Sequence, residues 1–272
     1  MAIDKISGKA LTDIDKISGI ATSAISKFGG QETSAASLPV RLSDLASWTD
    51  PADNSVGDTV MDDKTYNNYG PYSSTSNHIN GANGAAIVDL SGTKCMYLDG
   101  VNDRGYTQNV RNGTTNIWKA AGSLVTFTSE IWIRSNGSWV RNGNIINMGY
   151  NSAYRNRMNS NGTLWAHYRG LSDSTSSSLA TNTWHHLVFS MTGSGSNYST
   201  MNIYRNGTLF DTRANINRNP SYPYATRFFG GYGSTSESQR FYMGIARHYE
   251  DRALTQTEAA ANFDLEKANY GY

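Results

Sequence analysis

Residues 182–213, NTWHHLVFSMTGSGSNYSTMNIYRNGTLFDTR, give the strongest indication of the fold. The first half places two sets of residues on the two sides of one extended segment: Trp184, His186 and Val188, and His185, Leu187 and Phe189. Apolar residues on both sides predict a strand that is buried on both faces for part of its length. In the second half, apolar residues flank Asn206-Gly207, a dipeptide that suits a type I′ hairpin turn because both residues tolerate positive φ. The stretch therefore predicts a buried strand followed by a hairpin.

The rest of the chain up to residue 250 shows the same kind of pattern. In SLVTFTSEIWIRS (123–135) four apolar residues share one side of a predicted strand: Val125, Phe127, Ile131 and Ile133. In RFYMGIARHY (240–249) we expect Phe241, Met243 and Ile245 to share one face. Seven Asn-Gly dipeptides begin at Asn80, Asn83, Asn112, Asn136, Asn142, Asn161 and Asn206. Many short strands joined by such turns predict an all-β sandwich or jelly roll.

One short helix is predicted near the C-terminus, in LTQTEAAANFDLEKANYG (254–271). Thr255 is a good N-cap, and Glu258, three residues later, completes a capping box. Ala259, Phe263 and Leu265 would face the sandwich. A glycine at position 271 would end the helix.

Composition limits the classes of function. The chain has 272 residues, 17% of them charged, with a formal net charge of +1 and no basic run, so we expect no nucleic-acid partner. No stretch approaches 18 apolar residues, so no membrane insertion is expected. A single cysteine, Cys95, allows neither an intramolecular disulfide nor a cysteine-based metal site. The start MAIDKISG lacks a signal-peptide pattern, which favours synthesis and assembly in the cytoplasm.

Residues 3–35 consist of three copies of an eleven-residue unit, IDKISGKALTD, IDKISGIATSA and ISKFGGQETSA. An eleven-residue period can build a right-handed coiled coil, but a glycine recurs in each copy and costs about 1 kcal/mol in a helix interior. We therefore expect one short helical turn in each copy, too small to be stable alone. Such a segment would order on a partner surface; the alternative is a flexible tail.

The apolar residues expected to anchor this arm are Ile3, Ile6, Ile14, Ile17, Ile25 and Phe28. Residues 31–37 would be a linker.

Four segments resemble one known fold family. They are SWTDPADNSVGDTVMDDKTYNNYGPY (47–72), MYLDGVNDRGYT (96–107), the stretch quoted first, and MGIARHYEDRALTQTEAAANF (243–263). Together they resemble the laminin-G-like, concanavalin A-like jelly roll over roughly residues 45–270. The resemblance implies an N-terminal arm (1–35) and a jelly-roll domain (36–272) with a short C-terminal helix. The family's motifs mark the fold rather than a mechanism.

The N-terminal Ile-x-Lys-Ile-x-Gly units resemble the first residues of virion proteins from tailed bacteriophages. This resemblance implies a structural protein of the virion, in a fibre, in the tail or in a decoration. Residues 1–35 would bind other virion proteins. A homo-oligomer is expected, with a trimer favoured by analogy with fibres.

The sequence shows no arrangement typical of a glycosidase. Such enzymes place two carboxylates about 5–9.5 Å apart, often through a Glu-x-Asp-x-Glu strand. None of the six glutamates lies in such a pattern: Glu32, Glu130, Glu237, Glu250, Glu258 and Glu266. His185 and His186 point to opposite faces of their strand, so a structural role is favoured over a shared metal ligand. The sequence thus predicts that the chain is not an enzyme.

Two candidate binding sites remain. Asp99, Asn102 and Asp103 could hold calcium, although Asp99-Gly100 could equally form a simple turn. In residues 148–170 a group of aromatic and basic residues would contact a glycan: Tyr150, Tyr154, Arg155, Arg157, Trp165 and Tyr168. The same residues are common in strands and at protein interfaces.

We therefore expect a virion protein that binds host surface polysaccharide through its jelly roll. The alternatives are a decoration protein without a ligand and a polysaccharide-degrading enzyme.

Overall fold

The structure of the chain is a computed structural model. It describes part of the sequence: residues 5–6, 9–10, 16–17, 20–21, 27–28, 31–32, 45–61, 79–82, 84–101, 103–107, 126–140, 143–148, 154–168, 171–193, 198–217, 227–230 and 239–272. Among these residues no helix is both long enough and apolar enough to span a membrane.

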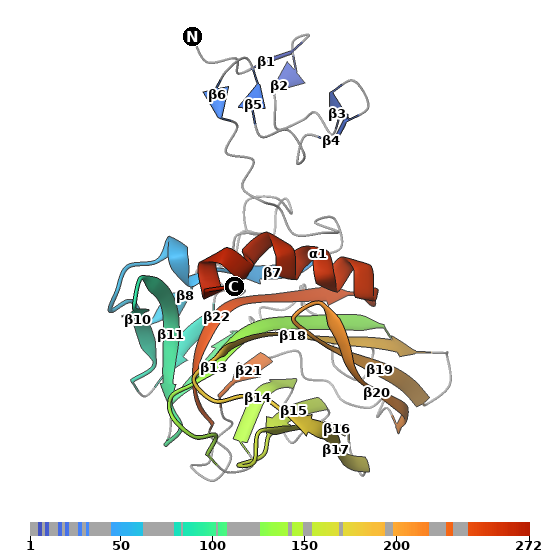
Figure 1. Cartoon of the computed structure of the whole chain (residues 1–272). Coiled ribbons are helices and arrows are strands. Elements are labelled where there is room, and N and C mark those ends of the chain that lie inside the picture. The colour runs from blue at the N-terminus through green and yellow to red at the C-terminus, as the bar shows by residue number, and fades with distance from the viewer. Residues whose placement is uncertain are drawn as a thin grey trace, which may run out of the picture.

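Two antiparallel sheets of eight strands each form the body of the protein. The helix-side sheet contains β7 (Leu45–Thr49), β10 (Ala86–Leu90), β11 (Thr93–Asp99), β13 (Phe127–Ser135), β18 (Trp184–Gly193), β19 (Tyr198–Arg205), β20 (Thr208–Asn217) and β22 (Arg240–Glu250). The second sheet contains β8 (Val60–Met61), β9 (Ile79–Ala82), β12 (Arg104–Thr107), β14 (Gly143–Met148), β15 (Tyr154–Met158), β16 (Thr163–Tyr168), β17 (Leu171–Ser178) and β21 (Arg227–Phe229). The helix α1 (Gln256–Glu266) lies across the helix-side sheet, and β14–β17 lie on the opposite side of that sheet (Figure 1). The predicted all-β sandwich with a short C-terminal helix is confirmed.

Two apolar clusters follow from the alternation of side chains along the strands. The main cluster contains Leu187 and Phe189 of β18 together with Ile146 and Leu164 of the second sheet, so it fills the space between the sheets. The other cluster contains Trp184 and Val188 of β18, together with residues of β7 and α1. The central strand is therefore buried on both faces, as predicted.

One prediction about β22 is wrong because of a β-bulge. Phe241 and Met243 lie in the main cluster, but Ile245 lies in the cluster under α1. The pairing of β22 with β13 shifts its register between Ile131 and Ile133. An extra residue in one strand reverses the direction of every side chain beyond it, so Ile245 leaves the face that Phe241 occupies.

Asn-Gly dipeptides play two different structural roles. Asn206 and Gly207 form the two-residue connection between β19 and β20 with φ values of 52° and 76°, which confirms the predicted hairpin. Asn80-Gly81, by contrast, lies inside β9, which pairs with β8 and β12. A Cβ atom at position 81 would lie 2.4 Å from the Ala85 carbonyl oxygen, so this glycine permits a close backbone approach and makes no turn.

The C-terminal helix begins at the predicted cap, and Ala259 and Phe263 pack against the apolar cluster as predicted, but the helix also buries polar residues that were not predicted. Thr255 and Glu258 form the expected capping box. The buried residues of α1 are Ala259, Asn262 and Glu266, whereas Leu265 is only partly buried. The helix therefore presents polar groups to the sheet, which an apolar pattern could not reveal. A 3₁₀ turn (Lys267–Tyr270) follows, and Gly271 ends it with a φ of 81°.

Each N-terminal copy contains a small hairpin where a helical turn was predicted. β1 (Lys5–Ile6) pairs with β2 (Lys9–Ala10), β3 (Lys16–Ile17) with β4 (Ile20–Ala21), and β5 (Lys27–Phe28) with β6 (Gln31–Glu32). Two residues separate the paired strands in each copy, and they include glycine, which favours a hairpin connection over a helix. Ile3, Ile14 and Ile25 lie outside the described residues. The side chains of Ile6, Ile17 and Phe28 also lie outside them.

Candidate functional site

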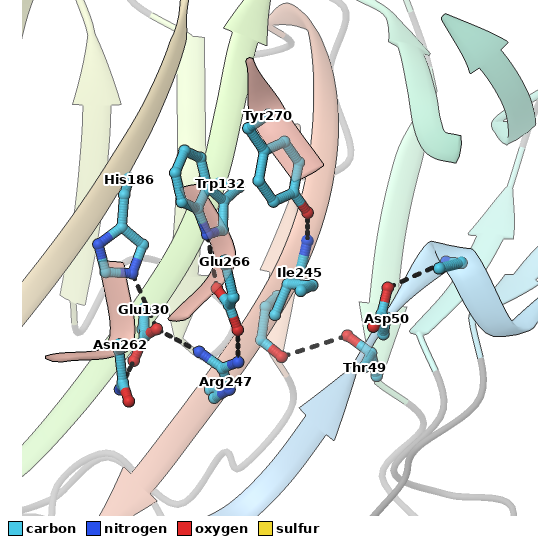
Figure 2. A network of polar contacts seen from close by, with 12 residues as sticks. Thr49, Asp50, Glu130, Trp132, His186, Ile245, Arg247, Asn262, Glu266 and Tyr270 are labelled. Carbon is cyan, nitrogen blue, oxygen red and sulfur yellow. Dashed lines mark hydrogen bonds and ion pairs between the residues drawn. The ribbon is translucent and has the colours of Figure 1, made fainter. Parts of the chain in front are cut away.

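A cluster of ionisable side chains lies between the helix-side sheet and α1. Glu130 of β13, His186 of β18, Arg247 of β22 and Glu266 of α1 converge there, each at most 4% exposed (Figure 2). His186 Nε2 lies 2.8 Å from Glu130 Oε1, and Arg247 forms ion pairs with both Glu130 and Glu266. Three strands and the helix thus contribute to one charged network.

Neutral groups add further hydrogen bonds to this network. The Trp132 indole N–H donates to Glu266 over 2.7 Å, and the Asn262 amide donates to Glu130 over 2.8 Å. The same amide lies 3.1 Å from the Tyr249 hydroxyl, and burial raises the pKa of that hydroxyl. Buried charges are tolerated when they are paired in this way.

The electrostatics of the cluster favour an ionised Glu130. Burial alone would raise the pKa of this carboxyl, but Arg247 and His186 outweigh burial and lower the pKa from 4.5 to about 2. An ionised carboxylate only accepts hydrogen bonds, so His186 Nε2–H is the donor in their contact.

The Glu130 cluster has the composition of an active site or a metal site. Single ligand atoms of Glu130, His186 and Glu266 lie within 4.8 Å of one another. However, the Arg247 guanidinium already pairs with both carboxylates, and a metal cation there would be repelled. Because α1 supplies Glu266 and Asn262, the arrangement fastens this helix to the sheet.

The second candidate site lies on the outer face of the second sheet. Ile145, Met158 and Leu164 belong to the main core, so their strand neighbours Asn144, Arg157 and Trp165 face outward. A bulge in β14 between Asn144 and Ile146 places Ile146 in the core as well, so Asn147, which follows it, also faces outward. The strand pairing aligns Asn144, Arg157 and Trp165 in one row across these three strands. We call this row the Asn144–Arg157–Trp165 ladder.

Direct contacts hold the ladder together. Arg157 Nε donates to Asn144 Oδ1 over 3.0 Å, and the Arg157 guanidinium lies 5.0 Å from the centre of the Trp165 ring. Arg157 and Trp165 are partly exposed, whereas Asn144 is buried. A cation over an indole face is a favourable arrangement that also fixes the orientation of the ring. The ladder thus presents an aromatic ring and a guanidinium on one surface, with the buried Asn144 amide fixing the guanidinium.

A second row runs beside the ladder. Asn147 of β14 pairs with Arg155 of β15 in the strand register. Asn147 is fully buried, and neither its amide nitrogen nor its amide oxygen has a hydrogen-bond partner among the described residues. An unpaired buried amide costs free energy, so this position is incompletely satisfied in the free chain.

The structure brings together some of the predicted glycan-contact residues. Arg155, Arg157 and Trp165 share the outer face of the second sheet. Tyr154 and Tyr168 are strand residues, but their side chains lie outside the described part, as does all of Tyr150. Sequence reasoning missed Asn144 and Asn147, because their alternation with the apolar residues of β14 becomes clear only once the strand pairing is known.

The Asp99–Asp103 segment forms a tight turn. Asp99 Oδ1 accepts from the Val101 amide over 2.7 Å, and Asp103 Oδ2 accepts from the Asp99 amide over 3.0 Å. Asp103 Oδ1 is buried without a partner among the described residues, and burial raises the pKa of Asp103. Asn102 lies outside the described residues. The turn is present, and calcium binding stays a prediction.

The two adjacent histidines have the structural positions predicted for them. His185 Nε2 lies 2.9 Å from the Ala180 carbonyl oxygen, and burial lowers the pKa of its imidazole. His186 packs its ring 5.0 Å from that of Trp132 within the Glu130 cluster. The two rings thus belong to different environments and share no ligand.

Comparison with known proteins identifies the family. The model of a concanavalin A-like lectin/glucanases superfamily domain matches residues 104–260, more than half of the chain. The chain belongs to this superfamily. No curated protein matches the sequence.

Solved structures in this superfamily's fold resemble the chain at low identity. A sialidase from Trypanosoma rangeli, in complex with sialic acid, matches with a TM-score of 0.60 and 16% identity over 90% of this chain. Domain 4 of a GH43 extracellular arabinanase from Geobacillus stearothermophilus, in complex with arabinotriose, matches with a TM-score of 0.55 and 14% identity. The match covers 82% of this chain and 98% of the arabinanase domain, but only 36% of the sialidase. This chain therefore spans about a third of the sialidase and nearly all of the arabinanase domain.

These matches correct one prediction. The sequence predicted that the chain is not an enzyme, because no pair of acidic residues had glycosidase spacing. That prediction is wrong as an exclusion, since the same sandwich occurs in a sialidase and in an arabinanase domain. Spacing in the sequence also cannot reveal every pair of neighbouring carboxylates, because the fold brings Glu130 and Glu266 together from distant parts of the chain.

Proposed function

We propose that this protein binds carbohydrate on the outer face of its second sheet, against the Asn144–Arg157–Trp165 ladder. The observation that carries the proposal is the partly exposed Trp165 ring fixed beside Arg157 and Asn144. The apolar face of a sugar ring stacks on an aromatic ring, while its hydroxyl groups exchange hydrogen bonds with amide and guanidinium groups. Such a combination of one apolar surface and a few fixed polar groups is typical of small-molecule sites.

The comparisons support this proposal at the level of the fold. Domain 4 of the arabinanase, whose whole length this chain resembles, was determined with arabinotriose bound. The fold alone does not define a function, and the residues of the ladder are what favour carbohydrate binding.

The test is a binding measurement with a panel of neutral and acidic polysaccharides. We expect Trp165→Ala to abolish binding to any polysaccharide that the wild-type chain binds. The matched control is Leu209→Ala, which truncates an exposed apolar side chain of β20 in the helix-side sheet and should leave binding unchanged. Retained binding in Trp165→Ala would show that the ligand lies elsewhere.

The N-terminal repeats favour a place in a larger assembly. We propose that residues 1–35 attach the chain to other proteins of a bacteriophage virion and that the sandwich faces outward to bind host polysaccharide. Three small hairpins of two-residue strands bury little surface alone, which supports a role on a partner surface. The test is whether full-length protein, but not a chain that begins at residue 36, is incorporated into assembled particles. Equal incorporation of both chains would contradict this role.

A further inference from the structure

The charge of the second sheet narrows the class of carbohydrate. Its eight strands contain four arginines, Arg104, Arg155, Arg157 and Arg227, and one acidic residue, Asp173. The difference is a formal charge of +3. The eight strands of the helix-side sheet contain six basic and five acidic residues, a difference of +1. Positive charge is therefore concentrated in the sheet that carries the ladder, although the whole chain is nearly neutral.

The arginines next to Trp165 have a defined geometry. Arg155 and Arg157 lie two residues apart on one strand and share its outer face, which separates their Cα atoms by roughly 6.5 Å. No aspartate or glutamate occurs in β14, β15 or β16, the strands that carry the ladder and its neighbouring row. A guanidinium matches a carboxylate through two parallel hydrogen bonds, which a neutral hydroxyl cannot provide.

Asn147 supplies a second, independent indication of a ligand. It lies opposite Arg155 in the strand register, and its side chain is fully buried without a hydrogen-bond partner among the described residues. A ligand group that donates to this amide or accepts from it would remove the free-energy cost of leaving it unpaired. The unsatisfied amide and the two arginines thus occupy the same part of the sheet.

We propose that the carbohydrate bound at this face is acidic, with a uronic-acid-type carboxylate placed at Arg155 and Arg157 and the sugar ring stacked on Trp165. This proposal rests on the carbohydrate-binding function above and specifies its ligand. The carboxylate would pair with the guanidinium groups, and a hydroxyl of the same or the next sugar would bond to the Asn147 amide, which is buried in the free chain and must be uncovered when the ligand binds.

The test compares two probes that differ only at the carboxyl group, which is ionised in one and a neutral methyl ester in the other. Isothermal titration calorimetry with oligogalacturonate and with its methyl ester, at low salt, should show about tenfold tighter binding of the acid. The difference should shrink as the salt concentration rises, because screening weakens the charge pairing.

Variants separate a specific site from general charge attraction. Arg157→Gln should remove the preference for the acid, and Arg157→Lys should retain a weaker, salt-sensitive preference without the two-bond geometry. The matched control, Arg213→Gln, removes the same charge from β20, where Arg213 pairs with Asp211, and should keep the preference. Circular dichroism of each variant establishes that it is folded.

The outcomes distinguish the two proposals. Equal binding of oligogalacturonate and its ester, or binding of neutral polysaccharides alone, would overturn the acidic ligand and leave the carbohydrate site intact. A loss of preference in Arg213→Gln equal to that in Arg157→Gln would also overturn it. If folded wild-type protein binds no polysaccharide of the panel, both proposals fail.

Discussion

Replacing Arg247 by methionine should destabilise the fold strongly, because this guanidinium is the cation between two buried carboxylates. In Arg247→Met, Glu130 and Glu266 keep their buried positions but lose their shared partner. Removing one partner of a buried ion pair costs about 3–5 kcal/mol, since an uncompensated charge stays in a poorly solvated site. The lowered pKa of Glu130 indicates a free-energy cost of similar size, because the change from 4.5 to about 2 corresponds to roughly 3 kcal/mol.

Urea denaturation followed by tryptophan fluorescence measures this effect, through the midpoint at an unchanged slope. The control is Arg252→Met, which breaks the more exposed ion pair between Arg252 and Glu258 and should cost less than about 1 kcal/mol. The triple variant Arg247→Met, Glu130→Gln, Glu266→Gln should recover part of the loss, because it removes the charges together. Equal destabilisation by Arg247→Met and Arg252→Met would show that the buried carboxylates do not depend on Arg247 for their stability.

The stability difference between wild type and Arg247→Met should depend on pH in a direction that follows from the pKa of Glu130. The pKa of Glu130 is lower in the folded chain than its ordinary value, so its stabilising contribution is present above pH 4.5 and is lost as the pH falls toward 2. In Arg247→Met, protonation at low pH discharges the unpaired carboxylate. The stability difference between wild type and Arg247→Met should therefore narrow below pH 4.5. A difference that is constant between pH 7 and pH 3 would contradict this account.

Three further predictions concern the seam between α1 and the sheet. Gly207→Ala should lower the free energy of unfolding by about 1–3 kcal/mol, because residue 207 has a positive φ and the new Cβ would lie 2.7 Å from the Ala260 Cα. The midpoint of urea denaturation measures this change, and an unchanged midpoint would contradict the prediction. Tyr270→Phe should cost about 1–3 kcal/mol, since it removes the hydroxyl that accepts from the Ile245 amide over 2.8 Å. Thermal denaturation measures this against Tyr242→Phe, a partly buried tyrosine whose hydroxyl has no hydrogen-bond partner among the described residues, and equal effects would argue against the prediction. The Cys95 thiol should react with a thiol reagent at pH 8 only as fast as the chain opens, because the thiol is buried and burial raises its pKa to about 12. Fast labelling of the native chain would disprove this prediction.

The parts of the fold that the sequence predicted depend on local signals. The Asn206-Gly207 turn and the Thr255–Glu258 capping box need only residues a few positions apart, and both are present. The bulge that turns Ile245 away from Met243 depends on pairing with β13, a strand from another part of the chain. The N-terminal hairpins were mistaken for helical turns because two-residue strands are too short to show the alternation that identifies a strand.

The candidate site could be predicted only in part, for the same reason. Arg155, Arg157 and Trp165 lie close in sequence, so their shared surface was within reach of pattern analysis. Asn144 becomes part of the ladder only through its register with Arg157, which the sequence does not state. Glu130 and Glu266 come from a central strand and the last helix, and no spacing rule connects them.

The two sheets show how one architecture treats polar residues on its outer faces in opposite ways. On the helix-side sheet, Glu130 and Arg247 are covered by α1, where Glu266 forms an ion pair with Arg247 and the Asn262 amide donates to Glu130. On the second sheet, no described helix lies over the Asn144–Arg157–Trp165 ladder, and Asn147 has no partner among the described residues. Buried polar groups in folded proteins almost always have partners. The polar groups of the helix-side sheet thus form a structural contact with α1, whereas Arg157 and Trp165 of the second sheet stay partly exposed beside the unpartnered Asn147 amide, and this difference is why the binding site is placed on the second sheet.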